Sequence, residues 1–265
     1  MSEAGVVRRL PTRGRERPSA ALREVQGDAR PFDLARLEDG TPHPPTWLFH
    51  PSRRWARWVV TRRYPVTVHG REHVPDRGPV ILAGNHVGLL DGPLLALFSP
   101  RPAHVMTKIE MFDGFLGTLL RATGQIPVDR FGCDPAAIKA SVRVLLDGRP
   151  LGVFPEGVRG DGELRHIRPG AAYLAMVTGA PIVPVALFGT RLPGTGRNSV
   201  PPPRTPIDVA FGRPLRVPRS PWPRTKGDVE ALRSRVQVHL RRHLVRSRLA
   251  TGRALPGPPA PEEER

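Results

Sequence analysis

The chain has 265 residues, 39% of them hydrophobic, and its formal net charge is +17 at pH 7. This length is enough for one sizeable domain with a buried core, and the positive charge indicates a negatively charged partner, whether nucleic acid, anionic membrane or phosphorylated substrate. The single cysteine, Cys133, excludes an internal disulfide and a zinc site built from several cysteines.

The N-terminal segment 1–45 mixes Arg, Pro, Glu and Gly without sustained periodicity, and we expect a disordered tail there. It has no apolar h-region typical of a secretory signal, and no apolar run in the chain approaches the ~20 residues that span a bilayer. We therefore expect a cytoplasmic protein that is either soluble or peripheral on the inner face of the cell membrane.

Segment 46–63 predicts an amphipathic helix that Ser52 could cap. Trp55 and Trp58 fall at helical spacing, and residues 47–71 contain six arginines and no acid. Tryptophan and arginine on a short helix are typical of a membrane interface. The same helix could instead pack its tryptophans onto the domain, and the sequence leaves both interpretations open.

From residue 64 to 215, short apolar runs alternate with helical patterns. Strands are expected over 65–68, 80–84, 103–107, 126–128, 151–154, 182–187 and 207–211. Helices are expected over 92–98, 109–122, 136–146 and 169–177, the third capped by Asp134 with a proline behind it. This alternation predicts a single α/β domain with a mostly parallel mixed sheet covered by helices on both faces.

After a connector rich in proline and arginine, Thr225-x-x-Asp228 predicts a capping box and a helix that runs to about residue 249. Leucines and valines form one stripe along this helix, with arginines around it. The segment 216–250 is thus a connector plus a basic amphipathic helix, whose stripe could face the core or support a membrane contact. Residues 251–265 are expected to be a disordered tail.

The first candidate for chemistry follows the strand expected over 80–84, where His86 is separated from Asp91 by four residues. A carboxylate bonded to one imidazole nitrogen holds the ring in one tautomer and stabilises the imidazolium, which suits a general base. On an ideal helix a five-residue step turns by about 140°, so the pair requires a bend, which Gly88 permits. Alone, such a pair also fits a loop histidine bonded to a helix-capping aspartate.

Other charged residues also follow strand ends: Arg130 after 126–128, and Glu156 and Arg159 after 151–154. Ligands of open α/β sheets bind outside the carboxyl ends of the strands, so we expect these residues to converge with His86. Arginine can grip a phosphate with two parallel hydrogen bonds, so this edge could hold a phosphorylated alcohol.

Four blocks in this order resemble the glycerolipid acyltransferases, particularly the 1-acylglycerol-3-phosphate acyltransferase family. The blocks are Asn85-His86-x4-Asp91, Gly124-x-Ile126-x-Val128-Asp129-Arg130, Phe154-Pro155-Glu156-Gly157-x-Arg159 and Pro181-Ile-Val-Pro184-Val185, and Lys108-x-Glu110 matches a further common element. The resemblance covers about residues 64–215, which would be the acyltransferase domain.

The resemblance implies transfer of a fatty acyl group from a thioester, on coenzyme A or acyl carrier protein, to the free hydroxyl of a lysophospholipid, most simply 1-acyl-sn-glycerol-3-phosphate. It implies His86 as general base oriented by Asp91. It assigns the acceptor's phosphate and glycerol to the group Lys108, Arg130, Glu156, Gly157 and Arg159. No metal and no cofactor besides the thioester co-substrate is implied, and the partners would include an anionic membrane surface but no nucleic acid.

Val158 and Gly160 replace two hydroxyl residues that the third block often carries, and Gly88 replaces a frequent serine in the first. No charged group is lost, so these departures concern the acceptor's head group more than the reaction. The alternatives are an acyltransferase of the same family for another head group, a basic lipid- or nucleic-acid-binding protein without catalysis, and a serine or thiol hydrolase. No zinc-finger, RNP-like or Gly-x-Ser-x-Gly pattern supports the last two classes.

Overall fold

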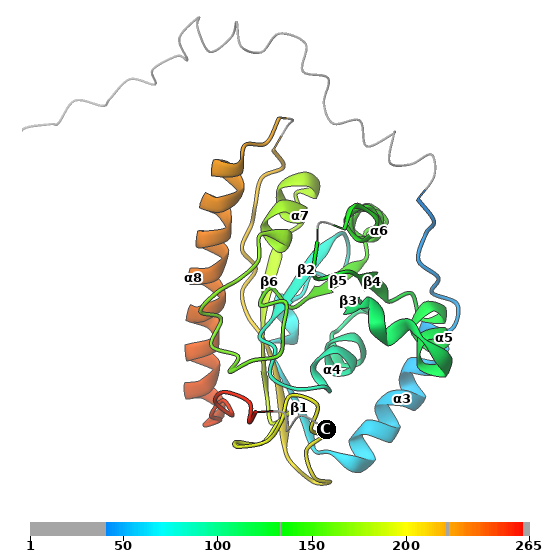
Figure 1. Ribbon diagram of the computed structural model, residues 1–265, viewed down its shortest axis with the longest axis vertical. Coiled ribbons are helices and arrows are strands. Elements are labelled where there is room, and N and C mark those ends of the chain that lie inside the picture. The colour runs from blue at the N-terminus through cyan, green and yellow to red at the C-terminus, as the bar shows by residue number, and fades with distance from the viewer. Residues whose placement is uncertain (1–40, 133, 221–222, 262–265) are drawn as a thin grey trace, which may run out of the picture.

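A computed structural model describes residues 41–132, 134–220 and 223–261. Most of the predicted N-terminal tail, residues 1–40, lies outside the described residues, as do Cys133 and residues 262–265. The described residues form one α/β unit around a central sheet (Figure 1).

The sheet has seven strands in the described part of the chain, in the order β1-β7-β6-β2-β5-β3-β4. Their bounds are β1 Val66–His69, β2 Val80–Gly84, β3 His104–Lys108, β4 Ile126–Val128, β5 Pro150–Val153, β6 Ile182–Phe188 and β7 Ile207–Phe211. All neighbouring pairs are parallel except β6 and β7. The predicted mostly parallel mixed sheet is confirmed, and the carboxyl ends of β2 to β6 meet at one edge.

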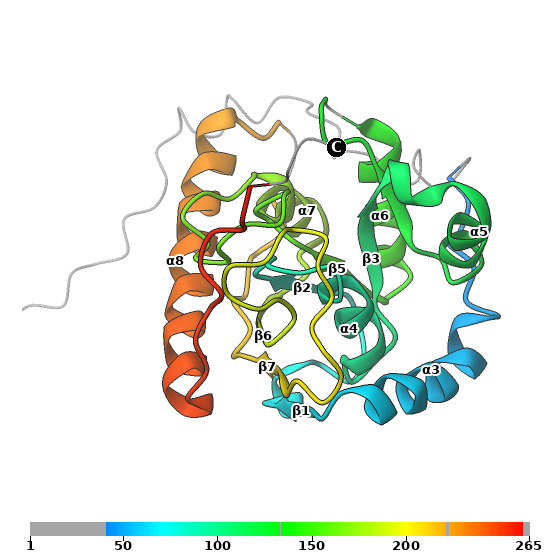
Figure 2. The ribbon, with the colours of Figure 1, turned by 60° about the horizontal axis from the view of Figure 1, so that its bottom comes forward.

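Helices cover both faces of this sheet. The α-helices are α3 (Phe49–Arg63), α4 (Asp91–Phe98), α5 (Gly114–Ala122), α6 (Pro135–Leu146), α7 (Gly170–Thr178) and α8 (Lys226–Thr251), and the short 3-10 turns are η1 (Arg71–His73) and η2 (Ile109–Phe112). The long helix α8 lies on one side of the molecule, whereas α3 and α5 lie on the opposite side in both views (Figures 1 and 2).

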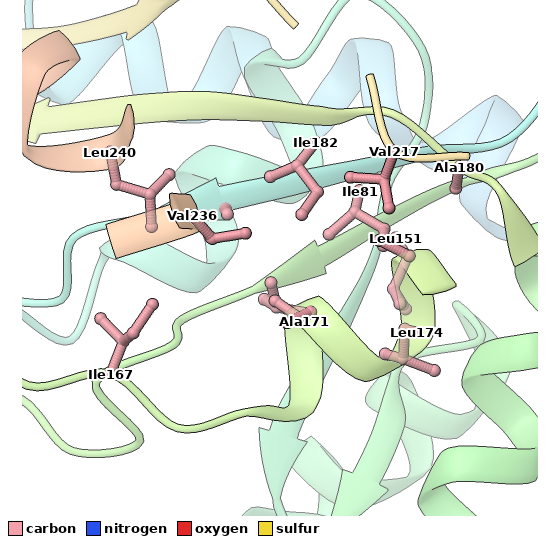
Figure 3. Close-up of a cluster of buried hydrophobic side chains, with 14 of the residues drawn as sticks. Ile81, Leu151, Ile167, Ala171, Leu174, Ala180, Ile182, Val217, Val236 and Leu240 are labelled. Atoms are coloured by element: carbon pink, nitrogen blue, oxygen red, sulfur yellow. The ribbon is translucent and has the colours of Figure 1, made fainter. Parts of the chain in front are cut away.

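The alternation of side chains along β2 explains the two layers. Val80 and Leu82 belong to a buried cluster with α3, α4 and β7, whereas Ile81 and Ala83 belong to a second cluster with α6, α7 and α8. Figure 3 shows the second cluster, in which side chains of the sheet, α7 and α8 gather. Because both faces are buried, the strands read as continuous apolar runs in the sequence.

Two elements differ from their predicted form. The helix expected over 109–122 is divided into η2 and α5, because Gly114, the first residue of α5, has a positive φ of 59°. Residues 252–261, within the predicted disordered tail, pack across the domain: Pro256 is buried, and the Ala260 amide donates to Thr195 O at 3.1 Å. Tertiary contacts, which composition does not reveal, hold this segment in place.

Within the described ranges, none of the helices combines the length and the apolar character that crossing a bilayer requires.

Candidate active site

The site begins where β2 ends. The His86 Nδ1 atom lies 2.8 Å from Asp91 Oδ2, and Asp91 is fully buried at the start of α4. A carboxylate only accepts hydrogen bonds, so Nδ1 carries the proton and Nε2 is the basic nitrogen. Among the described residues no hydrogen-bond partner occupies Nε2. The structure therefore brings the predicted pair together in the geometry of a general base and its orienting group.

The bend that this pair requires lies in residues 87–90. The same Asp91 Oδ2 also accepts hydrogen bonds from the backbone N–H groups of Val87 at 2.7 Å and Gly88 at 2.8 Å. A Cβ atom on Gly88 would lie 2.4 Å from Thr190 O, so a side chain at this position would force the loop away from β6. The glycine thus reflects a close approach of two backbones.

The block after β5 holds the His86 backbone from both sides. Glu156 Oε1 accepts a hydrogen bond from the His86 N–H at 2.9 Å, and the Gly160 N–H donates to His86 O at the same distance. The Phe154 ring stacks on the His86 ring, with centroids 4.2 Å apart. These contacts fix both the main chain and the ring plane of the histidine.

Burial raises the pKa of Glu156 to about 7, although the hydrogen bond from His86 opposes the shift. The negative charges of Asp161 and Asp91 raise it further. Glu156 was predicted to contact the acceptor. It does not line the cavity described below, and its carboxyl group accepts a hydrogen bond from the His86 backbone.

The sequence interpretation missed Arg191, which follows β6 and is only 2% exposed. Its guanidinium donates to Val87 O at 2.8 Å, to Thr195 O and Gly160 O at 3.0 Å each, and to Gly257 O. The sequence did offer a signal for Arg191: it is a charged residue just after the fourth block, at the carboxyl end of the strand expected over 182–187.

A cavity of about 800 Å³ opens beside His86. Its wall is mainly apolar and comes from α3, α4, β3, α5 and α6, with members such as Leu90, Leu97, Met106, Leu120 and Ile138. Ligand pockets of this size and character are common among small-molecule sites. The His86 imidazole lines this apolar cavity at the carboxyl edge of the sheet.

Cationic side chains surround the same cavity. Lys108, Arg130 and Arg159 line it together with Gly157, so the structure collects these predicted residues around His86. The Arg130 guanidinium makes long hydrogen bonds, to Gly157 O at 3.4 Å and Glu110 Oε1 at 3.5 Å, and lies over the Phe131 ring. Arg159 donates to Arg197 O at 3.1 Å. A fourth cation of the lining, Arg168, was not predicted; it donates to Arg130 O at 2.8 Å.

An exposed apolar surface adjoins the cavity. Trp55 and Leu116 line the cavity and are 65% and 45% exposed, and Phe115 and Phe131 are almost fully exposed. Trp58 on α3 is 58% exposed, so the structure does not pack the two tryptophans into the core. Exposed apolar groups of this size indicate a contact surface.

Comparison with known proteins gives the same family at several levels. The model of the Acyltransferase family matches residues 65–188. The 1-acyl-sn-glycerol-3-phosphate acyltransferase of Bacillus subtilis (strain 168) is 30% identical over 142 residues, which cover 53% of this chain and 69% of that protein. The enzyme of the same name from Borreliella burgdorferi is 34% identical over 131 residues, covering 47% and 52%.

The crystal structure of the 1-acyl-sn-glycerophosphate acyltransferase PlsC from Thermotoga maritima shares the fold, with a TM-score of 0.57 at 21% identity over 76% of this chain and 80% of that chain. Beyond the Bacillus protein, the matches span about half the length of curated relatives such as the chloroplastic enzyme of Arabidopsis thaliana. On the strength of the Bacillus match and the family model, the chain belongs to the acyltransferase family, which includes the 1-acyl-sn-glycerol-3-phosphate acyltransferases.

Proposed function

We propose that this protein transfers a fatty acyl group from an acyl thioester to the free hydroxyl of 1-acyl-sn-glycerol-3-phosphate, giving phosphatidic acid. The observation that carries the proposal is the His86–Asp91 pair, which opens onto an apolar cavity with cations at its wall. The relatives named for this reaction support the choice of acceptor. Coenzyme A and acyl carrier protein are both suitable thioester carriers.

In this mechanism His86 Nε2 takes the proton of the acceptor hydroxyl as the oxygen attacks the thioester carbonyl carbon. The imidazolium that forms is stabilised by Asp91, which lies 2.8 Å from Nδ1. The tetrahedral intermediate then collapses, the C–S bond breaks, and the proton of His86 passes to the departing thiolate. No residue of the protein is acylated at any step.

Three cations of the cavity wall, Lys108, Arg130 and Arg159, support the proposal that the acceptor's phosphate binds there. Arg130 suits this role because its contacts to Gly157 O and Glu110 are long and can be exchanged for a phosphate. A charge-assisted hydrogen bond to phosphate is worth roughly 1.5–3 kcal/mol, so two such contacts can select a phosphorylated acceptor.

The apolar lining of the cavity supports the proposal that the acyl chain binds inside it. A fatty chain that enters beside His86 leaves water, and each CH₂ group that becomes buried contributes about 0.8 kcal/mol to binding. The lysophospholipid acceptor of such a reaction resides in a bilayer, and the exposed apolar groups of α3 and α5 adjoin the cavity. We therefore place this surface against an anionic membrane, which the arginines of 53–63 would attract.

Thin-layer chromatography of radiolabelled products tests the proposal, with oleoyl-coenzyme A or an acyl carrier protein thioester as donor and a panel of lysophospholipids as acceptors. We expect phosphatidic acid as the main product. His86→Ala should lower the rate on the order of 10²–10⁴-fold without changing the melting temperature.

Activity retained in His86→Ala would refute the mechanism. Acylation of a different lysophospholipid alone would transfer the proposal to another head group. A salt-sensitive shift of DNA in gels without any acylation would instead favour the nucleic-acid-binding alternative.

A further inference from the structure

Arg191 heads the fully buried side chains of the described residues by volume, and the mechanism above does not use it. Its hydrogen bonds go to four backbone carbonyls, those of Thr195 in its own loop and of three further segments. Val87 O belongs to the loop that carries His86, Gly160 O to the loop that carries Glu156, and Gly257 O to the C-terminal segment. One guanidinium thus connects both loops of the candidate active site to residues 252–261.

The charge of Arg191 is also placed with respect to the histidine pair. Burial lowers the pKa of Arg191, and the negative charges of Asp91 and Asp161 oppose that shift. Asp91 is fully buried, and its Oδ1 atom has no hydrogen-bond partner among the described residues. Arg191 therefore supplies positive charge near a buried carboxylate whose second oxygen no described donor satisfies.

Other charged groups also lie around the pair. Glu156 bonds the His86 backbone, and its carboxylate interacts unfavourably with Asp91 and Asp161. Lys108, Arg130, Arg159 and Arg168 line the cavity beside His86. Arg191 differs from these cations because it is buried and because it bonds the backbones of both loops of the site.

We propose that Arg191 is a positioning residue of the acyltransferase site: through Val87 O and Gly160 O it holds the two loops around His86 in place. The inference rests on the proposed function for its rate measurement. Its second readout, the NMR resonances of the histidine ring, requires no substrate.

The test uses the full chain and the variants Arg191→Met and Arg191→Lys. Nitrogen-15 NMR follows the resonances of the His86 ring, assigned by those that disappear in His86→Ala. For Arg191→Met we expect these resonances to shift, because the loop that carries His86 loses its bond through Val87 O. We also expect kcat to fall roughly 10²-fold, as displaced catalytic groups commonly cause, with KM for both substrates within twofold.

Arg191→Lys retains the charge but cannot reproduce the fork of hydrogen bonds. Because one ammonium group replaces only part of this fork, the shift of the His86 resonances and the fall in kcat should both be smaller than in Arg191→Met. The matched control is Arg101→Met: Arg101 also bonds three carbonyls, those of Pro75, Gly78 and Gly148, at the opposite edge of the sheet. This control should lower the melting temperature without moving the His86 resonances or kcat.

Unchanged His86 resonances or an unchanged kcat in folded Arg191→Met would overturn the positioning role. If the His86 resonances shift in Arg191→Met as expected but the wild type acylates no lysophospholipid, the proposed function fails while the positioning role of Arg191 stands.

Discussion

Glu156 Oε1 accepts a hydrogen bond from the backbone N–H of His86 at 2.9 Å. The two residues are 70 positions apart in the chain, at the carboxyl ends of the neighbouring parallel strands β2 and β5. Together with the Gly160 N–H on His86 O, this contact makes the third sequence block a support for the first. Glu156 thus holds the backbone of the histidine in position.

Replacement of Glu156 by Gln should change how stability depends on pH. Burial raises the pKa of Glu156 from its ordinary 4.5 to about 7, so between these values the unfolded chain loses a proton that the folded protein keeps. Wild-type stability therefore falls as pH rises through this window, by at most roughly 3 kcal/mol. Chemical denaturation at pH 5, 6, 7 and 8 should show Glu156→Gln gaining relative to wild type up to pH 7 and then levelling off. Parallel profiles would contradict this.

The activity of Glu156 variants should depend on the hydrogen bond and not on the charge. Glu156→Gln keeps an oxygen that can accept from the His86 N–H, so we expect most of kcat to remain. Glu156→Ala leaves that N–H unsatisfied, and we expect a loss of about tenfold or more. Glu163→Ala is the matched control, because Glu163 lies in the same region but pairs with Arg248. Equal losses in the Gln and Ala variants would argue that the charge itself is required.

The arginines of the cavity wall should act on the acceptor. Arg130→Ala and Arg159→Ala should each raise KM for 1-acyl-sn-glycerol-3-phosphate about tenfold or more, and KM for the acyl donor much less, because each removes a contact to phosphate. Steady-state kinetics with one substrate varied at a time measures both constants. Arg241→Ala, on the exposed face of α8, serves as control and should change neither. Matching increases for donor and acceptor would assign these arginines to the thioester carrier.

The tryptophans of α3 should control membrane binding. Trp55 and Trp58 are 65% and 58% exposed, so Trp55→Ala/Trp58→Ala should weaken flotation with anionic vesicles while leaving the melting temperature unchanged. Binding of wild type should also decline as salt shortens the Debye length below ~8 Å.

The matched control for this experiment is Val238→Ala/Leu249→Ala on α8, which is on the opposite side of the molecule from α3 (Figures 1 and 2). A membrane contact through α8 was an expectation from its sequence, and a loss of flotation in this control would restore it. Undiminished flotation of the tryptophan variant would place the contact elsewhere.

The length of the cavity should set the length of the acyl chain. Ala96 lines the cavity five residues after Asp91, about 7.5 Å along α4 from the histidine pair. Ala96→Phe fills this deeper part, so we expect kcat/KM to shift towards shorter acyl-coenzyme A substrates by about fourfold for each CH₂ group excluded. Leu97→Ala should shift the preference the other way. An unaltered chain-length profile in both variants would place the acyl chain outside the cavity.

Several features of this protein follow from the sequence because local interactions determine them. Asp134 accepts from the Ala137 N–H at 2.9 Å, and Thr225 and Asp228 form their capping box, as the residues at those positions predict. The alternation of strands and helices implied parallel pairing, and the carboxyl ends of parallel strands share an edge. That topological fact is sufficient to bring His86 and Arg130 to one site.

Tertiary structure alone decided the features that depend on contacts between distant residues. The strand order and the antiparallel pairing of β7 do not follow from local pattern, and neither does the exposure of Trp55 and Trp58. Arg191 reads as one arginine among many until folding places it 2.8 Å from Val87 O, 104 residues away. Residues 252–261 resemble a solvated tail by composition, because proline-rich segments pack only where a partner surface already exists. The sequence by itself thus indicated the polar groups of the candidate site and the sheet edge at which they lie. Tertiary contacts decided which side chains from distant parts of the chain support them.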